Sequence, residues 1–392
     1  MNWMSLVILG ITVYFLFFGL IFGLKRGFLH SILRLITVGI AFAAAWFLKD
    51  VYVAAAMNVE IGGFGVRALL AELAAESPAL SSLIEKFAEL ALGVVLFVLV
   101  FLLLKLITLI VFGVLKIFVP KGKKRIFGMI VGLVQGALIA FCVCAPLNGL
   151  LVDTAKLADL DMGETVDTSA VQEIGAQAKA YTDGFVSSVY TSVGGGFYKA
   201  LTTAENESGA EITISGCVDA AVSSAKITGV FESVANMDMS DGFTEENRDT
   251  IHQLFKDLDA IKGEMGEDSM EIVNEIVSAT VADFGAELPE SVKTVLEDFD
   301  LSEVNFEKEG DILMDLYDLA ENSEGEIAAA DVVNTLAEST VVLPVIESVL
   351  ASEDTHIELP DEKSKAEVSS AIAGIEDPEV AEMLRNLFGL AA

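Results

Sequence analysis

The chain of 392 residues contains only three cysteines, which are too few for a disulfide-stabilised scaffold. Neither half offers a nucleophile with a neighbouring base, so an exported hydrolase is disfavoured, and we expect no enzymatic activity, cofactor or metal. Basic residues are also scarce, with 24 Lys and Arg against 58 Asp and Glu and a net charge of −34. Because such an acidic chain repels phosphate, a nucleic-acid partner is excluded.

The charge is divided very unevenly along the chain. Residues 1–152 carry 12 basic and 6 acidic side chains, a net of +6, so the remaining 12 basic and 52 acidic side chains give residues 153–392 a net of −40. An apolar, slightly basic front part followed by an acidic rear part is typical of a membrane domain joined to a water-soluble domain.

Four stretches of the front part are long and apolar enough to span a bilayer as helices, since about 20 apolar residues cross its ~30 Å hydrocarbon core. They cover residues 3–24, 28–48, 90–119 and 126–152. The first stretch is not a secretory signal, because its basic pair, Lys25 and Arg26, follows the apolar run instead of preceding it. We therefore predict a four-span membrane domain over residues 1–152.

Basic residues gather in two clusters, Lys25-Arg26 and residues 121–125, which two spans separate. Lys and Arg favour the cytoplasmic side of a membrane, so both clusters can lie in the cytoplasm. This orientation places the N-terminus, the loop 49–89 and everything after residue 152 outside the cell. In the loop, residues 66–74 and 80–87 show helical spacing of apolar side chains, so we expect short helices at the membrane surface.

Glycine recurs every four residues in two of the spans. This spacing puts the glycines of each series on one helix face, where the backbone of another helix can approach closely, so we predict tight packing at both faces. The series are Gly19, Gly23 and Gly27 at the end of the first span, and Gly128, Gly132 and Gly136 at the start of the fourth.

The polar side chains inside the predicted spans include Arg34, Lys105 and Gln135. A charged side chain there costs roughly 3 kcal/mol on an insertion scale. Arg34 and Gln135 lie roughly 12 and 15 Å from the basic clusters at 1.5 Å per residue, so a hydrogen bond between them is one hypothesis, and snorkelling of Arg34 toward the headgroups is the other. For Lys105 we favour a polar cavity lined by protein. No acidic residue lies in the four stretches, which argues against a proton relay.

The segment Arg26-Gly27-Phe28 resembles the Arg-Gly-Phe motif that opens the second helix of the CvpA family, the colicin V production proteins. Arg125 and Gly128, with the spaced glycines that follow them, are similar to the second motif of that family. The likeness covers residues 1–152, including the order of the four spans and the long loop after the second.

Two residues depart from the family pattern. Lys124 stands where the family often has Asp, and Gln135 stands where it often has Arg, so any ion pair that those residues make in other members cannot form here in the same way. The resemblance implies a bacterial cytoplasmic-membrane protein tied to toxin production or export, or to envelope homeostasis. It supplies no catalytic residues.

The acidic part is predicted to be a second all-α domain. Residues 153–168 are polar and read as a tether, and residues 169–392 follow as an acidic helical domain outside the membrane. Apolar side chains recur with helical spacing at residues 251–261, 292–299, 313–320, 332–336 and 380–387, whereas residues 212–214 are the only strand candidate. Gly194-Gly195-Gly196 reads as a hinge, because no Lys-Ser/Thr follows it as in a phosphate loop.

Two functions remain open from the sequence. The first is a non-enzymatic membrane protein that presents its acidic domain to a cationic peptide, a wall component or a protein partner outside the cell. The alternative is a subunit of an oligomeric channel or transporter, with Arg34, Lys105 and Gln135 along a polar path. The acidic surface also has a simpler interpretation, which is that it keeps the domain soluble and away from anionic lipid.

Overall fold

The computed structural model describes residues 2–61, 64–65, 81–115, 125–159, 169–205, 211–235, 245–284, 300–322, 329–344, 346–347, 356–357, 359 and 361–390. Nearly all elements in these ranges are helices, and the two small sheets have two strands each, so the predicted all-α class is confirmed. The chain divides into two compact units: residues 1–160 with 166–222, and residues 161–165 with 223–392.

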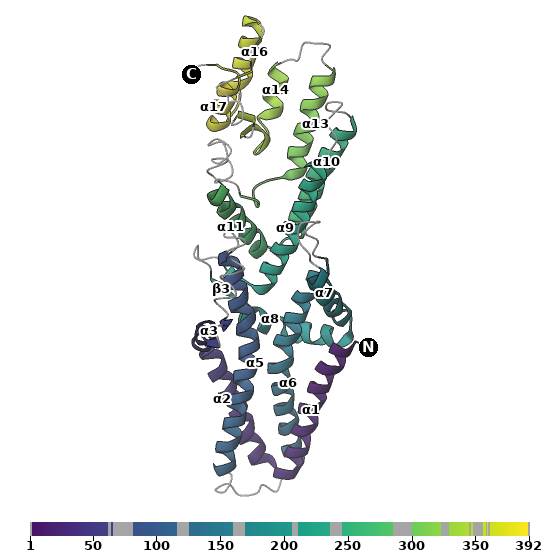
Figure 1. Ribbon diagram of the computed structural model, residues 1–392, viewed down its shortest axis with the longest axis vertical. Coiled ribbons are helices and arrows are strands. Elements are labelled where there is room, and N and C mark those ends of the chain that lie inside the picture. The colour runs from purple at the N-terminus through teal and green to yellow at the C-terminus, as the bar shows by residue number, and fades with distance from the viewer. Residues whose placement is uncertain are drawn as a thin grey trace. The chain divides into compact units, whose positions relative to one another are not determined.

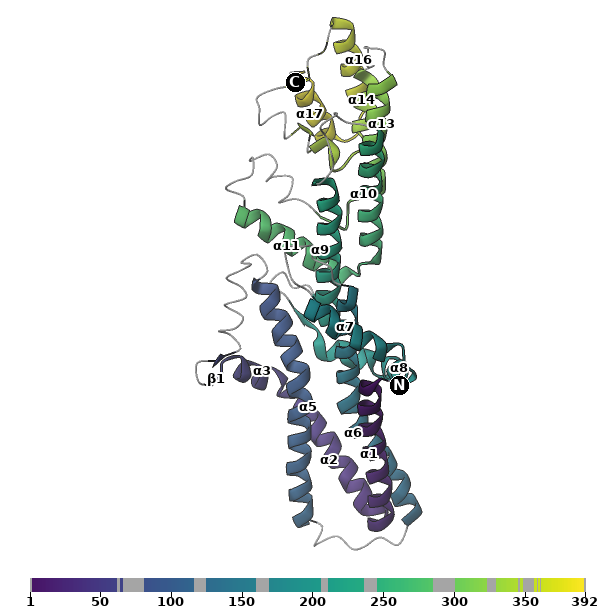
Figure 2. The same cartoon turned by 45° about the vertical axis from the view of Figure 1, so that its right-hand side comes forward.

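Four helices of the first unit are long and apolar enough to cross a membrane, and each corresponds to one predicted span (Figures 1 and 2). They are α1 (Trp3–Arg26), α2 (Phe28–Phe47), α5 (Ser81–Leu115) and α6 (Arg125–Lys156). Large apolar side chains on these helices, such as Phe17, Leu103 and Ile130, are more than half exposed. Exposed apolar side chains of this kind are what lipid covers in a membrane protein.

A single glycine makes the turn between α1 and α2. Gly27 has φ 78° and ψ 176°, a combination that only glycine adopts readily, and its N–H donates to the Gly23 carbonyl 3.0 Å away. The start of α6 lies against this turn, because Gly128 approaches Gly23 and Gly27. Lys25, Arg26 and Arg125 therefore lie at one end of the four helices, which we call the basic end.

Between α2 and α5 lies a short helix, α3 (Lys49–Met57), which packs on α5. A two-residue antiparallel pair follows, β1 (Glu60–Ile61) with β2 (Phe64–Gly65), in which Ile61 is opposite Phe64. The helix expected over residues 66–74 lies outside the described residues. Residues 81–87 are not a separate surface helix, because they form the first turns of α5, which begins nine residues before the predicted span.

The first unit extends well beyond residue 152. Helix α6 runs on to Lys156 and is followed by η3 (Leu157–Asp159), α7 (Ser169–Thr182) and α8 (Phe185–Thr202). Both α7 and α8 pack against α6. Next come the antiparallel strands β3 (Ala204–Glu205) and β4 (Glu211–Ile212), and then α9 (Ile214–Ala235), which starts within this unit. The compact units thus divide near residue 222, and Asp153 to Lys156 are helical where we expected a tether.

The three consecutive glycines do not form the predicted hinge, because Gly194, Gly195 and Gly196 lie inside the continuous helix α8. Packing explains the first of them: a Cβ atom at Gly194 would lie 2.6 Å from the Cβ of Ala145 on α6. Contact with α6 thus outweighs the poor helix propensity of glycine, which costs about 1 kcal/mol per residue relative to alanine.

The second unit is built from helices of about two to five turns. The described ones after α9 are α10 (Glu245–Glu264), α11 (Glu267–Phe284), α13 (Phe306–Asn322), α14 (Ala329–Leu336), α16 (Glu362–Ile372) and α17 (Pro378–Leu387). Four of the predicted helical segments correspond to α10, α13, α14 and α17, and the one at 292–299 lies outside the described residues. Leu336, Leu343, Ile372 and Leu384 are among the buried side chains of one core that joins α14, α16 and α17.

Glu309 fixes the chain after α14 to α13. Its side chain is buried, and its carboxylate accepts hydrogen bonds from Ser339 Oγ and Thr340 N, both at 2.6 Å, and from Val342 N at 3.1 Å. Burial alone would raise the pKa of Glu309, but these donors stabilise the charged form more strongly and leave the pKa below its ordinary value.

Candidate functional site

The two glycine series meet each other in the contact between α1 and α6, the most extensive helix pair of the described chain. A Cβ atom at Gly19 would overlap the carbonyl oxygen of Gly132, and one at Gly128 would lie 2.6 Å from the carbonyl oxygen of Gly23. Gly136 likewise lies against the backbone of α1, at Phe15. The backbones therefore touch along three turns, and only glycine fits between them.

The segments around Gly27 and Gly128 come together at the basic end. Gly128 abuts Gly27 directly, and the rings of Phe28 and Phe127 lie edge to face with centroids 6.2 Å apart. The Arg26 guanidinium lies over the ring of Phe22, 5.0 Å from its centroid, which is a cation–π distance. Two segments about a hundred residues apart in the sequence thus form one packed site.

Two buried cationic side chains, Arg34 on α2 and Lys105 on α5, lie near each other. Lys105 Nζ on α5 donates to Thr37 Oγ1 at 2.9 Å and approaches the Arg34 carbonyl oxygen at 3.5 Å. The Arg34 guanidinium lies 4.8 Å from the ring centroid of Phe22 on α1. Both side chains are at least nine-tenths buried.

Gln135 is buried on α6, but within the described residues no hydrogen bond joins it to Arg34, so that hypothesis is not supported. Arg34 stacks on Phe22 instead. Among the described residues, Lys105 donates hydrogen bonds to a hydroxyl and a carbonyl oxygen, and none of its hydrogen bonds goes to a carboxylate. This arrangement can hold positive charge inside the helices, because each cation has a polar or aromatic partner within the protein.

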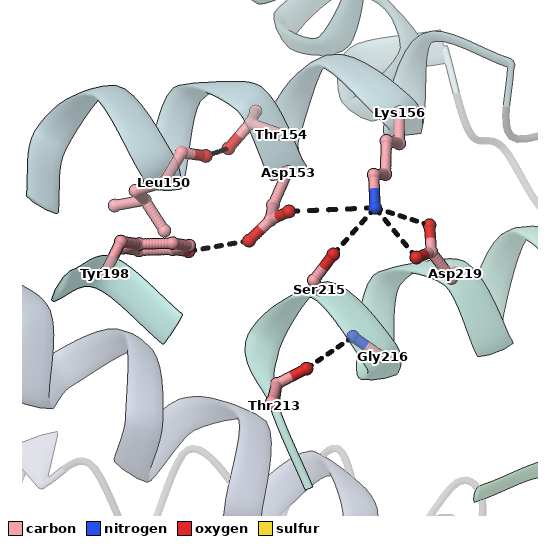
Figure 3. A network of polar contacts seen from close by, with 9 residues as sticks. All are labelled: Leu150, Asp153, Thr154, Lys156, Tyr198, Thr213, Ser215, Gly216 and Asp219. Carbon is pink, nitrogen blue, oxygen red and sulfur yellow. Dashed lines mark hydrogen bonds and ion pairs between the residues drawn. The ribbon is translucent and has the colours of Figure 1, made fainter. Parts of the chain in front are cut away.

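A polar network lies at the end of α6 remote from the basic end (Figure 3). Asp153 is 3% exposed, and its Oδ2 accepts a hydrogen bond from the Tyr198 hydroxyl of α8 at 2.7 Å. Lys156, one turn further along α6, lies 3.8 Å from Asp153 Oδ1 and 2.7 Å from Asp219 Oδ1 on α9. It also donates to Ser215 Oγ at 2.7 Å. One lysine and one buried aspartate thus tie α8 and α9 to α6.

Charge and burial keep the Tyr198 hydroxyl protonated. Burial and the adjacent Asp153 carboxylate raise the pKa of Tyr198 above its ordinary value, so the phenol remains a hydrogen-bond donor at all physiological pH values. The network therefore acts as a structural clamp. Within the described residues no group of three or more His, Cys, Asp or Glu side chains could hold a metal ion.

The part of the chain that contains the membrane helices matches a known protein family. Residues 5–171 match the family model described as the colicin V production protein. Over these residues the chain is similar to the colicin V production proteins. The comparison with curated proteins gave no match, and the comparison with solved structures gave none either.

The matched family region contains the glycine contact, the buried cations Arg34 and Lys105, and the α6 half of the polar network. It ends inside α7, so the residues of α8 and α9 that bind Asp153 and Lys156 lie beyond it. The colicin V production resemblance drawn from Arg26-Gly27-Phe28 and from Arg125 and Gly128 is thus confirmed.

Sequence reasoning missed the clamp, because it assigned Asp153 and Lys156 to a tether. The spacing of these residues was an available signal, since side chains three apart on a helix lie on the same face. Tyr198, Ser215 and Asp219 gave no such signal, because their partners on α6 are about 45 to 65 residues away in the sequence.

Proposed function

We propose that the chain is a non-enzymatic protein of the bacterial cytoplasmic membrane that presents its acidic helical part to partners outside the cell. The observation that carries this proposal is the clamp at the end of α6, where Lys156 and Asp153 hold α8 and α9. The family match supports a membrane protein related to colicin V production, and toxin production or export and envelope homeostasis are the roles we propose within it.

The proposed orientation follows from the charge distribution. Lys25, Arg26 and Arg125 lie at the basic end, and Lys and Arg prefer the cytoplasmic side. The N-terminus and the acidic part would then lie outside, as our topology requires. A cysteine introduced at Glu376, an exposed residue, should react with a membrane-impermeant thiol reagent in intact cells, whereas a cysteine at Lys25 should react only after lysis. The reverse pattern would contradict the orientation.

The acidic part would recognise positive charge. Residues 153–392 carry a net charge of −40, which attracts a cationic peptide, a basic wall component or a basic protein surface and speeds its association. Because exposed charges are screened over about 10 Å at 0.1 M salt, the interaction should weaken as the ionic strength rises.

In-cell photocrosslinking tests this interaction with the full chain. A photoreactive residue in place of Glu376 should give a defined crosslinked species whose yield falls when the cells are irradiated at higher salt. The same probe at Phe17 on the apolar surface of α1 is the control. Recovery of lipid adducts alone from Glu376, without any protein or wall partner, would contradict the proposal.

A second candidate function rests on the buried cations. Arg34 and Lys105 place two positive charges inside the four helices, at a cost that a purely structural bundle would avoid. In an oligomer they could line a path for polar or anionic solutes. Lys105→Leu should then lower the conductance measured in reconstituted bilayers, with Lys86→Leu, a partly exposed lysine near the start of α5, as the control. An unchanged conductance removes Lys105 from such a path.

A further inference from the structure

Helix α8 differs in charge from the acidic sequence that surrounds it. Residues 169–202, which include α7 and α8, contain two acidic and two basic side chains and are therefore neutral, within a part of the chain whose net charge is −40. Helix α8 itself contains one charged residue, Lys199, and no acidic residue. This composition is unusual for a helix of a water-soluble acidic domain, whose surface is charged.

One face of α8 packs against the membrane helices. Gly194 packs on Ala145, and the Tyr198 ring packs on Gly149, both on α6. Tyr190 shares a hydrogen bond of 2.7 Å with Thr12 on α1. Helix α8 thus contacts α1, α5 and α6, and it lies at the level of the N-terminal end of α1 (Figures 1 and 2).

An aromatic cluster adds to this contact. Phe197 of α8 lies 5.4 to 5.9 Å, between ring centroids, from rings on three membrane helices. These rings are Phe42 and Trp46 on α2, Phe97 on α5 and Phe141 on α6. Offset and edge-to-face ring pairs at such distances add about 0.5–1.5 kcal/mol each to the burial energy.

The contacts place α8 at the depth where a bilayer ends. Ala145 follows Arg125 by 20 residues, which corresponds to about 30 Å of helix at 1.5 Å per residue. Trp46 follows Phe28 by 18 residues, or about 27 Å. Since the hydrocarbon core is ~30 Å thick and begins near the basic end, α8 lies at the opposite hydrocarbon boundary.

The outward half of α8 is divided into an apolar strip and a polar strip. Residues advance by 100° per position around a helix, so Phe185, Val189 and Val193 fall within 80° of one another, and all three are exposed, at 83%, 41% and 67%. Ser188, Ser192 and Lys199 form the adjacent strip and are exposed as well. Val193 and Ser188 are five positions apart, which separates them by 140° around the axis.

We propose that α8 lies in the plane of the membrane at the interface opposite the basic end, with its apolar strip against lipid acyl chains and its polar strip toward headgroups and water. Three faces then have three environments: the bundle, lipid and water. A helix with one face packed on the bundle, an apolar strip and a polar strip suits the membrane–water interface. There the apolar side chains enter the acyl region by several ångströms. Exposed apolar side chains also occur on α1, whose Thr12 shares a hydrogen bond with Tyr190 of α8.

This assignment extends the membrane part past the family region, which ends at residue 171. It also closes the bundle at that end, since Phe197 fills the space between α2, α5 and α6. The proposal stands apart from the function of the acidic part, because it concerns only contacts within residues 1–222.

Spin labels on the reconstituted full chain test the proposal. A nitroxide is attached to a cysteine at Val193 or, in the matched variant, at Ser188, and its collision rates with oxygen and with a water-soluble nickel complex are measured in lipid vesicles. The native thiols Cys142, Cys144 and Cys217 are buried, and wild type treated with the same spin label gives the background signal. Val189 and Ser192 give a second pair on the same helix.

Labels at Val193 and Val189 should collide with oxygen in preference to the nickel complex, and labels at Ser188 and Ser192 should show the opposite preference, with the ratio differing several-fold between strips. Equal access of the nickel complex to both strips would show that α8 lies in water and would overturn the proposal. Low access of both reagents at Val193 would show that protein, such as a second copy, covers the strip, and would also overturn it.

Discussion

Gly128→Ala is the most direct test of the packing in the membrane unit. The added methyl group would lie 2.6 Å from the Gly23 carbonyl oxygen and 2.6 Å from the carbonyl carbon of Gly27, whereas an ordinary van der Waals contact begins near 3.4 Å. The obstructing atoms belong to the backbone, so no side chain can rotate away. The two helices must separate locally by about 0.8 Å, and a gap of 0.5–1 Å forfeits a quarter to a half of each dispersion contact.

The cost follows from this displacement. Overpacking of a close-packed site costs about 1–3 kcal/mol, and the better helix propensity of alanine returns up to about 1 kcal/mol. We expect a net loss of about 1–2 kcal/mol, which raises the population of the open α1–α6 contact by about five- to thirtyfold, since 1.4 kcal/mol is a factor of ten.

Cys144 provides the assay. Its Sγ is buried on α6, 3.8 Å from Thr12 Oγ1 and 3.9 Å from the Ile8 carbonyl oxygen of α1, so it becomes reactive when the two helices separate. The labelling rate of Cys144 by a thiol-reactive dye should rise by the same five- to thirtyfold factor in Gly128→Ala. Gly39→Ala is the matched control, because no atom lies within 4 Å of a Cβ there. Equal rates in the two variants would refute the reasoning.

Three further predictions concern buried polar groups. Tyr198→Phe leaves Asp153 without its 2.7 Å donor and should destabilise the membrane unit by about 1–3 kcal/mol in chemical unfolding, whereas Ser192→Ala should have no measurable effect. Lys105→Met removes a buried cation and should raise the thermal stability of the reconstituted protein, because Thr37 keeps its 2.7 Å hydrogen bond to a backbone carbonyl; a lower stability would count against this. The pKa of Glu309 is lowered in the folded chain, so its stabilising effect is complete above its ordinary value of 4.5 and is lost as the pH falls through the folded value. The difference in melting temperature between wild type and Glu309→Gln, followed by circular dichroism, should therefore narrow below pH 4.5, and a constant difference would contradict it.

The membrane helices could be predicted from sequence because their chemistry is local. A run of apolar residues bounded by charges defines a span, and α1, α2 and α6 begin within a residue of the predicted positions. Helix α5 begins nine residues before the predicted span, which starts at 90, because charged residues such as Glu85 end the apolar run but not the helix. A helix continues through charges once it has left the lipid, so hydropathy marks the membrane boundary and not the helix boundary.

The contacts made by glycine were less predictable. Spacing by four indicated that Gly19 and Gly132 lie on packing faces, but it could not show that the two series pack on each other. Gly194 shows the converse problem: three glycines in sequence favour a break, and only the proximity of Ala145, 49 residues earlier, explains why a continuous helix forms there. The low helix propensity of glycine is outweighed here by a tertiary contact that the sequence does not reveal.

The pairing of α1 with α6 sets an order of events during synthesis. Gly23 and Gly128 are 105 residues apart, so at about 5–20 residues per second a ribosome needs roughly 5–20 s to deliver the second glycine stripe after the first. During that interval the glycine face of α1 has no partner helix from its own chain and is exposed to lipid. A second copy of the chain that is inserted nearby carries the same glycine face on its own α6. Insertion of several copies close together therefore favours exchange of α1 between molecules.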